Sequence, residues 1–248
     1  YSYELNNKKA PFDNVNVRKA LNLSLDRNVI TDKVLGQGQT PTYVFTPTYI
    51  EEGHLIQQPA YSKEPMAQRN EEAIKLLEEA GYSKANPLKF SILYNTNENH
   101  KKVAIAAASM WKANTKGLID VKLENQEWKT YIDSRRAGRY DAARAGWNAD
   151  YNQATTFGNY FLSNSSNNTA KYANPEYDKA IAESYVATDA VGRAKAYAKA
   201  EEILAKDFGI VPIFNYVNPR LVKPYVKGYS GKDPQDHIYL RNLYIITH

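Results

Sequence analysis

The feature that most constrains the fold is an alternation of helix and strand patterns between residues 70 and 147. The segment NEEAIKLLEEAG has apolar residues at helical spacing, with Asn70 as a predicted N-cap and Gly81 at its end. The pattern continues as a strand at 88–95, a helix at 98–114, a strand at 120–126, a helix at 127–138 and a strand at 140–147. This order is typical of a largely parallel sheet flanked by helices, so we predict an α/β fold.

The flanking regions extend this fold. Asp13 is a predicted N-cap for a helix over 14–25, and a second helix over 27–35 ends at Gly36. Further along, the patterns predict two helices at 175–186 and 190–208 and an apolar strand at 209–216.

Two stretches lack a regular period. Residues 36–66 are rich in Gly, Pro, Thr and Tyr, and they predict a long ordered loop of the kind that is often functional. From Asn218 onward, prolines, turn residues and short β segments replace the helical patterns. We therefore expect a main unit over 1–217 and a separate, β-rich C-terminal tail over 218–248, without a helix.

Composition excludes some classes of function. The chain has a formal net charge of +5 and a pI near 9.0, but its longest basic runs are pairs such as Lys101-Lys102. Nucleic-acid binding usually needs a clustered basic stripe, so we expect no nucleic-acid partner. The absence of Cys excludes disulfides and thiolate metal sites. The 20 Tyr residues suit a wet binding cleft, because each combines an apolar ring with a hydroxyl.

Sequence motifs give no support for catalysis or a cofactor. The four histidines lack metal-ligand spacing, and no nucleotide-binding loop or nucleophile elbow is present. Paired carboxylates such as Glu201-Glu202 lie on helices with charged neighbours, which favours a solvated face. We expect no enzyme activity, cofactor or metal. A peptidase or other hydrolase that uses Asp141 or Asp150 stays open as an alternative.

The segment RAGWNADYN (144–152) places opposite charges close together after a strand. Arg144 can hold a carboxylate by two hydrogen bonds, and Asp150 can hold an ammonium group. Ala145 and Gly146 leave the backbone accessible to an extended chain, and Trp147 offers a flat wall. A free peptide carries all the complementary groups. The alternative is that Arg144 and Asp150 pair with each other, or with neighbouring residues, at a loop.

The whole chain resembles the C-terminal half of the periplasmic oligopeptide-binding proteins, the OppA type of ABC-transporter substrate-binding protein. The stretches that carry the resemblance are NNKKAPFDNVNVRKALNLSLDR, ILYNTNENHKKVAIA, LENQEWKTYIDSRR, DAARAGWNADYN, LSNSSNNTA and NPRLVKPYVKGYSGKDP. They are spread over the full length, so the resemblance does not depend on a single motif.

The resemblance implies one lobe of a type II (cluster C) periplasmic binding protein. Residues 1–217 would be the second large peptide-binding lobe, and 218–248 would cross a hinge and complete an N-terminal first lobe that this chain lacks. Short peptides would bind in extended form in the cleft between the lobes, in the periplasm, for delivery to a membrane ABC permease. A receptor for murein tripeptide or another modified peptide of the same family is the alternative.

The resemblance also assigns roles to individual residues. Asp150 would hold the α-ammonium group of the peptide, and Arg144 and His100 would meet its carboxylate. The remaining assigned residues would line the peptide backbone and the side-chain pockets: Ala145, Gly146, Trp147, Asn148, Trp128, Arg135, Thr169 and Glu4. Trp128 has an alternative role as a core anchor at the start of a helix.

Overall fold

The computed structural model describes residues 1–231, 233 and 235–247, and its centre is a five-stranded sheet. The strand order is β4-β3-β5-β1-β6. The bounds are β1 Ser2–Leu5, β3 Leu88–Asn95, β4 Ile119–Gln126, β5 Ala142–Ala145 and β6 Ile210–Pro212. Strand β3 pairs in parallel with both β4 and β5, which confirms the predicted α/β alternation.

Strand β1 makes the sheet mixed. It lies between β5 and β6 and is antiparallel to both, with Tyr3 opposite Arg144 on one side and Val211 on the other. The predicted strand at 209–216 therefore does join the main sheet, through β6. Strand β1 thus lies directly beside β5, which carries Arg144 and Ala145, and β6 lies on the other side of β1.

The predicted helices occur in the predicted order, but 29–35 is π-helical, α5 was not predicted, and some ends differ. Their bounds are α1 Val15–Leu23, α2 Met66–Glu79, α3 Glu98–Asn114, α4 Trp128–Arg136, α5 Thr155–Gly158, α6 Pro175–Val186 and α7 Ala190–Lys206. The N-cap of α1 is Asn14, not Asp13, because the Asn14 side chain accepts from the Asn16 N–H. Helix α2 begins before the predicted cap Asn70, directly after Pro65.

The two faces of the sheet are covered by different helices. Helices α1, α2 and α3 bury one face, where Trp111 is fully buried against Tyr3 and Phe90 and donates to the Leu21 carbonyl. Helix α4 covers the other face through Tyr131. This arrangement leaves the carboxyl ends of β3, β4 and β5 at one common edge.

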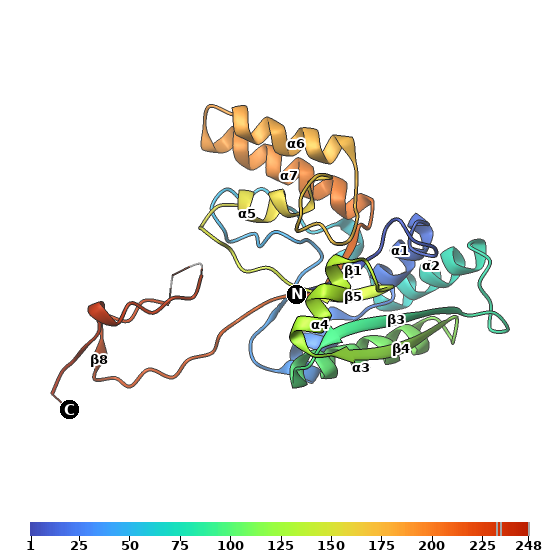
Figure 1. Cartoon of the computed structure of the whole chain (residues 1–248), viewed down its shortest axis with the longest axis horizontal. Helices are drawn as coiled ribbons and strands as arrows, with labels where there is room; N and C mark the ends of the chain where they lie inside the picture. Colours follow the sequence, from blue (N-terminus) through green and yellow to red (C-terminus); the bar gives the residue numbers. More distant parts are fainter. Residues whose placement is uncertain (232, 234, 248) are drawn as a thin grey trace.

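A second apolar cluster holds the hairpin of α6 and α7 against α5 (Figure 1). Between these units, residues 36–66 form the predicted loop. It begins at Gly36, the C-cap of a π-helix, and contains the two-residue strand β2 (Thr40–Pro41) and the 3₁₀ turn η2 (Ala60–Lys63). The π-helical turn itself is η1 (Val29–Leu35). Strand β2 pairs with β7 (Phe214–Asn215), which fixes the loop beside the sheet.

The tail after Asn218 extends away from the rest of the molecule (Figure 1). Its described residues form the short antiparallel pair β8 (Val226–Lys227) and β9 (Tyr244–Ile245). The expectation of no helix there needs one correction, because Leu240–Asn242 form a single 3₁₀ turn, η4. Within the described residues, no helix combines the length and the apolar character needed to cross a membrane.

Candidate ligand-binding site

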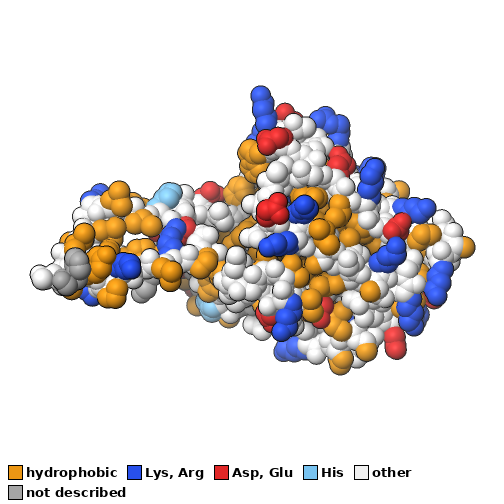
Figure 2. All heavy atoms as spheres, turned by 90° about the horizontal axis from the view of Figure 1, so that it is seen from below, with side chains coloured by type: hydrophobic (Ala, Val, Ile, Leu, Met, Phe, Trp, Pro, Cys, Tyr) orange, Lys and Arg blue, Asp and Glu red, His pale blue; other side chains and the backbone are white. Residues whose placement is uncertain are grey.

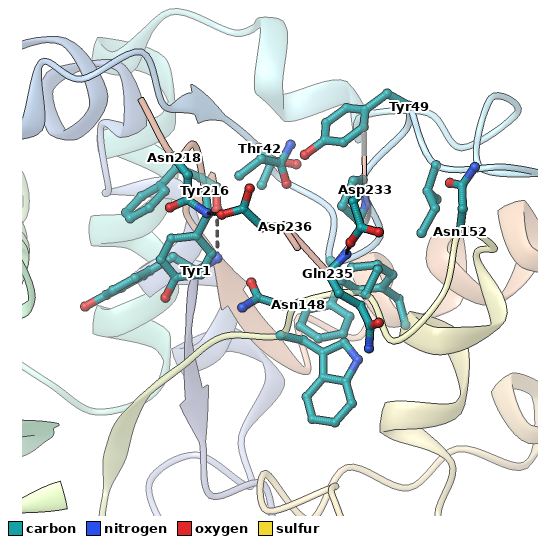
Figure 3. A pocket seen from close by; sticks show the side chains of 18 of the residues that line it. Tyr1, Thr42, Tyr49, Asn148, Asn152, Tyr216, Asn218, Asp233, Gln235 and Asp236 are labelled. Carbon is teal, nitrogen blue, oxygen red and sulfur yellow. Dashed lines mark hydrogen bonds between the residues drawn. The ribbon is translucent and has the colours of Figure 1, made fainter. Parts of the chain in front are cut away.

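A cavity of about 570 Å³ lies between the lobe and the first part of the tail (Figure 3). The wall on the lobe side comes from the long loop, from the segment after β5 and from the chain around β7. The tail contributes the opposite wall, including Asp233, Gln235 and Asp236. Most of this wall is irregular backbone, so its shape depends on what anchors each loop.

Two of the predicted site residues, Trp147 and Asn148, line this cavity. The Trp147 indole N–H donates to the Thr156 hydroxyl at 3.3 Å, and its ring meets Tyr160 edge to face. Asn148 is labelled in Figure 3, where it lies between Tyr1 and Gln235. The segment after β5 therefore does form part of a cavity wall, with one fixed aromatic plane.

Arg144 lies on β5 without an acidic partner among the described residues. One guanidinium N–H donates to the Tyr216 hydroxyl at 3.0 Å, and the group lies 5.6 Å from the centre of the Tyr1 ring. Its Nε is buried and has no hydrogen-bond partner in the described structure. A largely buried cation with unused donors can accept an anionic ligand.

His100, in the first turn of α3, lies near enough to Arg144 for the charge of Arg144 to act on it. Its ring packs 5.5 Å from the Tyr1 ring, and its Nδ1 is a further buried atom without a partner in the described residues. Burial, and after it the charge of Arg144, lowers the pKa of His100 to about 3. At neutral pH His100 is therefore an uncharged donor or acceptor beside a permanent cation.

Asp150 is exposed and does not pair with Arg144, and its side-chain partner is a neighbour in the following segment, Thr156. Its carboxylate accepts a hydrogen bond from the Thr156 hydroxyl at 3.1 Å. The backbone N–H of Asp150 donates to the hydroxyl oxygen of Thr156. No salt bridge to Asp150 occurs in the described part of the chain. The negative charge is thus held in place by Thr156 and stays available to a ligand.

Between these two charges, Gly146 has a packing reason to be glycine. A Cβ atom at this position would lie 2.7 Å from the Tyr216 hydroxyl oxygen, which is closer than real contacts allow. Ala145 before it is fully buried in β5. Gly146 therefore lets Tyr216 reach Arg144, a contact that pattern reasoning missed because residues 146 and 216 are distant in sequence.

Three predicted pocket residues are brought together, but they bind one another. The Glu4 carboxylate is fully buried and accepts from Arg135 at 2.7 Å, from Tyr160 at 2.7 Å and from Thr169. None of these residues lines the cavity described above. The interpretation of Glu4, Arg135 and Thr169 as pocket walls thus gains no support from the cavity, because their polar groups satisfy each other inside the lobe.

Trp128 lies elsewhere. Its side chain is 55% exposed and stacks on Tyr131 at 5.8 Å. The alternative role of a core anchor is therefore wrong. The residue presents an aromatic face to the outside of α4, beyond the described cavity lining.

The sequence interpretation missed two buried charges that hold the long loop. Arg27 is fully buried and donates to the Thr42 and Pro212 carbonyls, which belong to cavity-lining residues, at 3.0 and 2.7 Å. Glu201 accepts from the backbone N–H groups of Phe45 and Thr46. The prediction that Glu201 and Glu202 both lie on a solvent-exposed helix face is therefore wrong for Glu201, which is only 5% exposed.

Signals for other functions are weak in the structure. The two acids of the hydrolase alternative, Asp141 and Asp150, lie beyond opposite ends of β5. Asp141 forms a salt bridge with Lys9 at 2.7 Å and accepts hydrogen bonds from Ser91. The described residues contain no group of three or more His, Asp or Glu side chains that could hold a metal ion. Figure 2 shows Lys and Arg scattered over one face with Asp and Glu among them, without a basic stripe.

Comparison with known proteins finds a matching family and similar proteins. The model of the bacterial extracellular solute-binding proteins, family 5, matches residues 1–169. The chain is 97% identical to the periplasmic oligopeptide-binding protein OppA of Haemophilus influenzae over all 248 residues, which are 46% of that protein. It is 44% identical to the periplasmic murein peptide-binding protein MppA of Escherichia coli, again over its full length and 46% of the relative. The chain thus spans about half the length of the curated relatives it matches.

A solved structure agrees. The crystal structure of Haemophilus influenzae OppA in complex with the peptide RPPGFSPFR matches with a TM-score of 0.93 and 96% identity, over 99% of this chain and 48% of that one. The fold of one lobe of such a protein, inferred above from residues and resemblance, is therefore confirmed. This chain belongs to the bacterial extracellular solute-binding proteins of family 5.

Proposed function

We propose that this chain forms the second lobe of the solute-binding component of an ABC peptide importer. In the intact protein, short peptides bind in extended form in the cleft between two lobes and are delivered to a membrane permease from the periplasm. Residues 1–217 form the lobe, and 218–248 cross the hinge and complete the first lobe.

The observation that carries this proposal is a pair of opposite charges without protein counter-ions. Arg144 uses only Tyr216 as a side-chain hydrogen-bond partner, and Asp150 uses only Thr156, within the described structure. Between them lie the buried Ala145, the half-buried Gly146 and the fixed ring of Trp147. A free peptide has a carboxylate for Arg144 and His100, an ammonium group for Asp150 and a backbone for the segment between them.

The named relatives support the same class of ligand. One is named for oligopeptides, and its matching crystal structure contains a peptide. The more distant relative is named for murein peptide, so a receptor for murein or other modified peptides is the second candidate. Both candidates need a cleft with charges at its ends. They differ in whether an unmodified peptide is sufficient.

Thermal unfolding of the intact two-lobed protein tests the proposal. We expect a rise in Tm with unmodified tri- to pentapeptides, because a ligand that binds only the folded state stabilises it by mass action. A rise with murein tripeptide alone would favour the second candidate. No rise with either class would contradict the proposal. Mass spectrometry of the same mixtures should find intact peptide, whereas cleaved peptide would favour a hydrolase.

A further inference from the structure

Glu52 has an unusual backbone for its residue type. Its φ angle is +64°, in the left-handed region that residues with a Cβ atom rarely adopt. It is nevertheless only 4% exposed, although a Glu side chain normally prefers water. A conformation of this kind persists where the surroundings fix it, and it is common near functional sites. The contacts of the side chain show what fixes it.

Both carboxylate oxygens of Glu52 are occupied. Arg193 on α7 reaches one oxygen through Nε and through Nη2, each at 2.6 Å. The side-chain amide of Gln153 donates to the other oxygen at 3.0 Å. Glu52 therefore joins the long loop, helix α7 and the segment that follows Asp150.

Backbone contacts strengthen the same connection. The N–H of Ala154 donates to the Glu51 carbonyl at 3.0 Å, and the Glu51 N–H donates to the Asn152 side chain at 3.3 Å. Asn152 itself lines the cavity (Figure 3). Gln153 in turn accepts from the Thr155 hydroxyl at 2.7 Å, next to the Thr156 that binds Asp150.

We propose that Glu52 is a positioning residue for the ammonium site: through Arg193 and Gln153, it fixes the segment 150–154 so that the Asp150 carboxylate stays where a peptide amine can meet it. Glu52 does not touch the ligand. The inference rests on the proposed function, because it assigns Asp150 to the ligand's ammonium group. It adds a residue that neither the sequence pattern nor the resemblance singled out.

The test uses the intact protein and two probes, trialanine and N-acetyl-trialanine, measured by isothermal titration calorimetry. Glu52→Gln removes the charge that holds Arg193. Glu52→Gly removes the side chain but suits the left-handed backbone, so it keeps the test valid if Glu52→Gln folds poorly. Glu183→Gln is the matched control, because Glu183 pairs with Lys199 on the same helical hairpin at 3.1 Å and its side chain is 42% exposed.

We expect both Glu52 variants to bind trialanine about tenfold more weakly than wild type, a shift of one decade in Kd. Binding of N-acetyl-trialanine should change by less than about twofold, because that probe has no ammonium group for Asp150. Glu183→Gln should match wild type with both probes. Loss of the wild-type preference for the free amine in the Glu52 variants is thus the supporting result.

Two outcomes overturn the inference separately from the proposed function. If the Glu52 variants keep the wild-type ratio between the probes, or weaken both probes equally, Glu52 has only a structural role. If wild type itself binds both probes equally, the ammonium role of Asp150 fails, and the role of Glu52 fails with it. In the first case the binding of peptides by the intact protein stands.

Discussion

Two irregular regions of the molecule line the same cavity, but they are held in opposite ways. The long loop, residues 36–66, is fixed by buried charges. Arg27 donates to the Thr42 carbonyl, and Glu201 accepts from the N–H groups of Phe45 and Thr46. Glu52 links the loop to α7. The tail, residues 218–247 where described, exposes large apolar side chains such as Leu240 at 76% and Ile245 at 70%. Lack of regular structure therefore does not by itself indicate a loosely held segment.

The difference has a physical reason. Buried backbone groups need hydrogen-bond partners, and a loop without helix or sheet must find them in side chains. The long loop finds them in Arg and Glu residues from helices beside it. The hydrogen bonds of the tail's described side chains, such as those of Arg220 and Asp233, are exposed and lie within the tail itself. Its exposed apolar residues match the proposal that a first lobe covers them in the intact protein.

The largest expected effect comes from removing an anchor of the loop. Arg27→Met leaves the carbonyls of Thr42 and Pro212, and three further acceptors on Asn22 and Leu25, without their donor. It should lower the free energy of unfolding by about 5 kcal/mol or more, because each buried group left unpaired costs about 1–3 kcal/mol. Urea denaturation of the 248-residue chain measures it. Arg220→Met is the matched control in the tail, where Arg220 pairs with Asp236. An equal loss in both variants would contradict the comparison.

A smaller effect is expected at Glu201. Glu201→Ala leaves the N–H groups of Phe45 and Thr46 unpaired, and each unpaired buried group costs about 1–3 kcal/mol. The exposed neighbour supplies the control, because Glu202 pairs with Lys206 on the surface. Urea denaturation of Glu201→Ala and Glu202→Ala should separate the two acids. Equal stability of the two variants would show that Glu201 does not anchor the loop.

The pH dependence of stability gives a second view of Glu201. Burial raises the pKa of its carboxyl above the ordinary 4.5. The folded state then binds the proton more tightly than the unfolded state, so this contribution to stability is complete below pH 4.5 and is lost as pH rises through the folded pKa. Relative to Glu201→Gln, the wild-type free energy of unfolding should fall over that window. A difference that stays constant with pH would refute this assignment.

The smallest effect in this chain is expected in the tail. Ile245→Lys replaces an exposed side chain and should change the free energy of unfolding of the 248-residue chain by less than about 0.5 kcal/mol. In the intact protein the same change should cost about 2 kcal/mol or more, the value of one buried large aliphatic side chain. Matching small effects in both proteins would mean that the first lobe does not cover this residue.

Local patterns predicted the central α/β alternation correctly, because each strand and helix carries its own period. They could not predict the place of β1, since its partners Ala143 and Ile210 lie far away in sequence. The charges of RAGWNADYN were visible because the residues that matter are close together. Arg27, Glu201 and Glu52 were not, because their partners are backbone atoms and side chains that only the folded chain brings near.

The central claim is that Asp150 holds the ammonium group of a peptide, and calorimetry of the intact Asp150→Ala variant with trialanine tests it most directly. Removing one partner of a charge pair at a binding site typically costs 2 kcal/mol or more, so we expect affinity to fall by about 30-fold or more. Trp147→Ala, which removes a single aromatic wall of the cavity, should cost less. Equal affinity of wild type and Asp150→Ala for unmodified peptides would contradict the account.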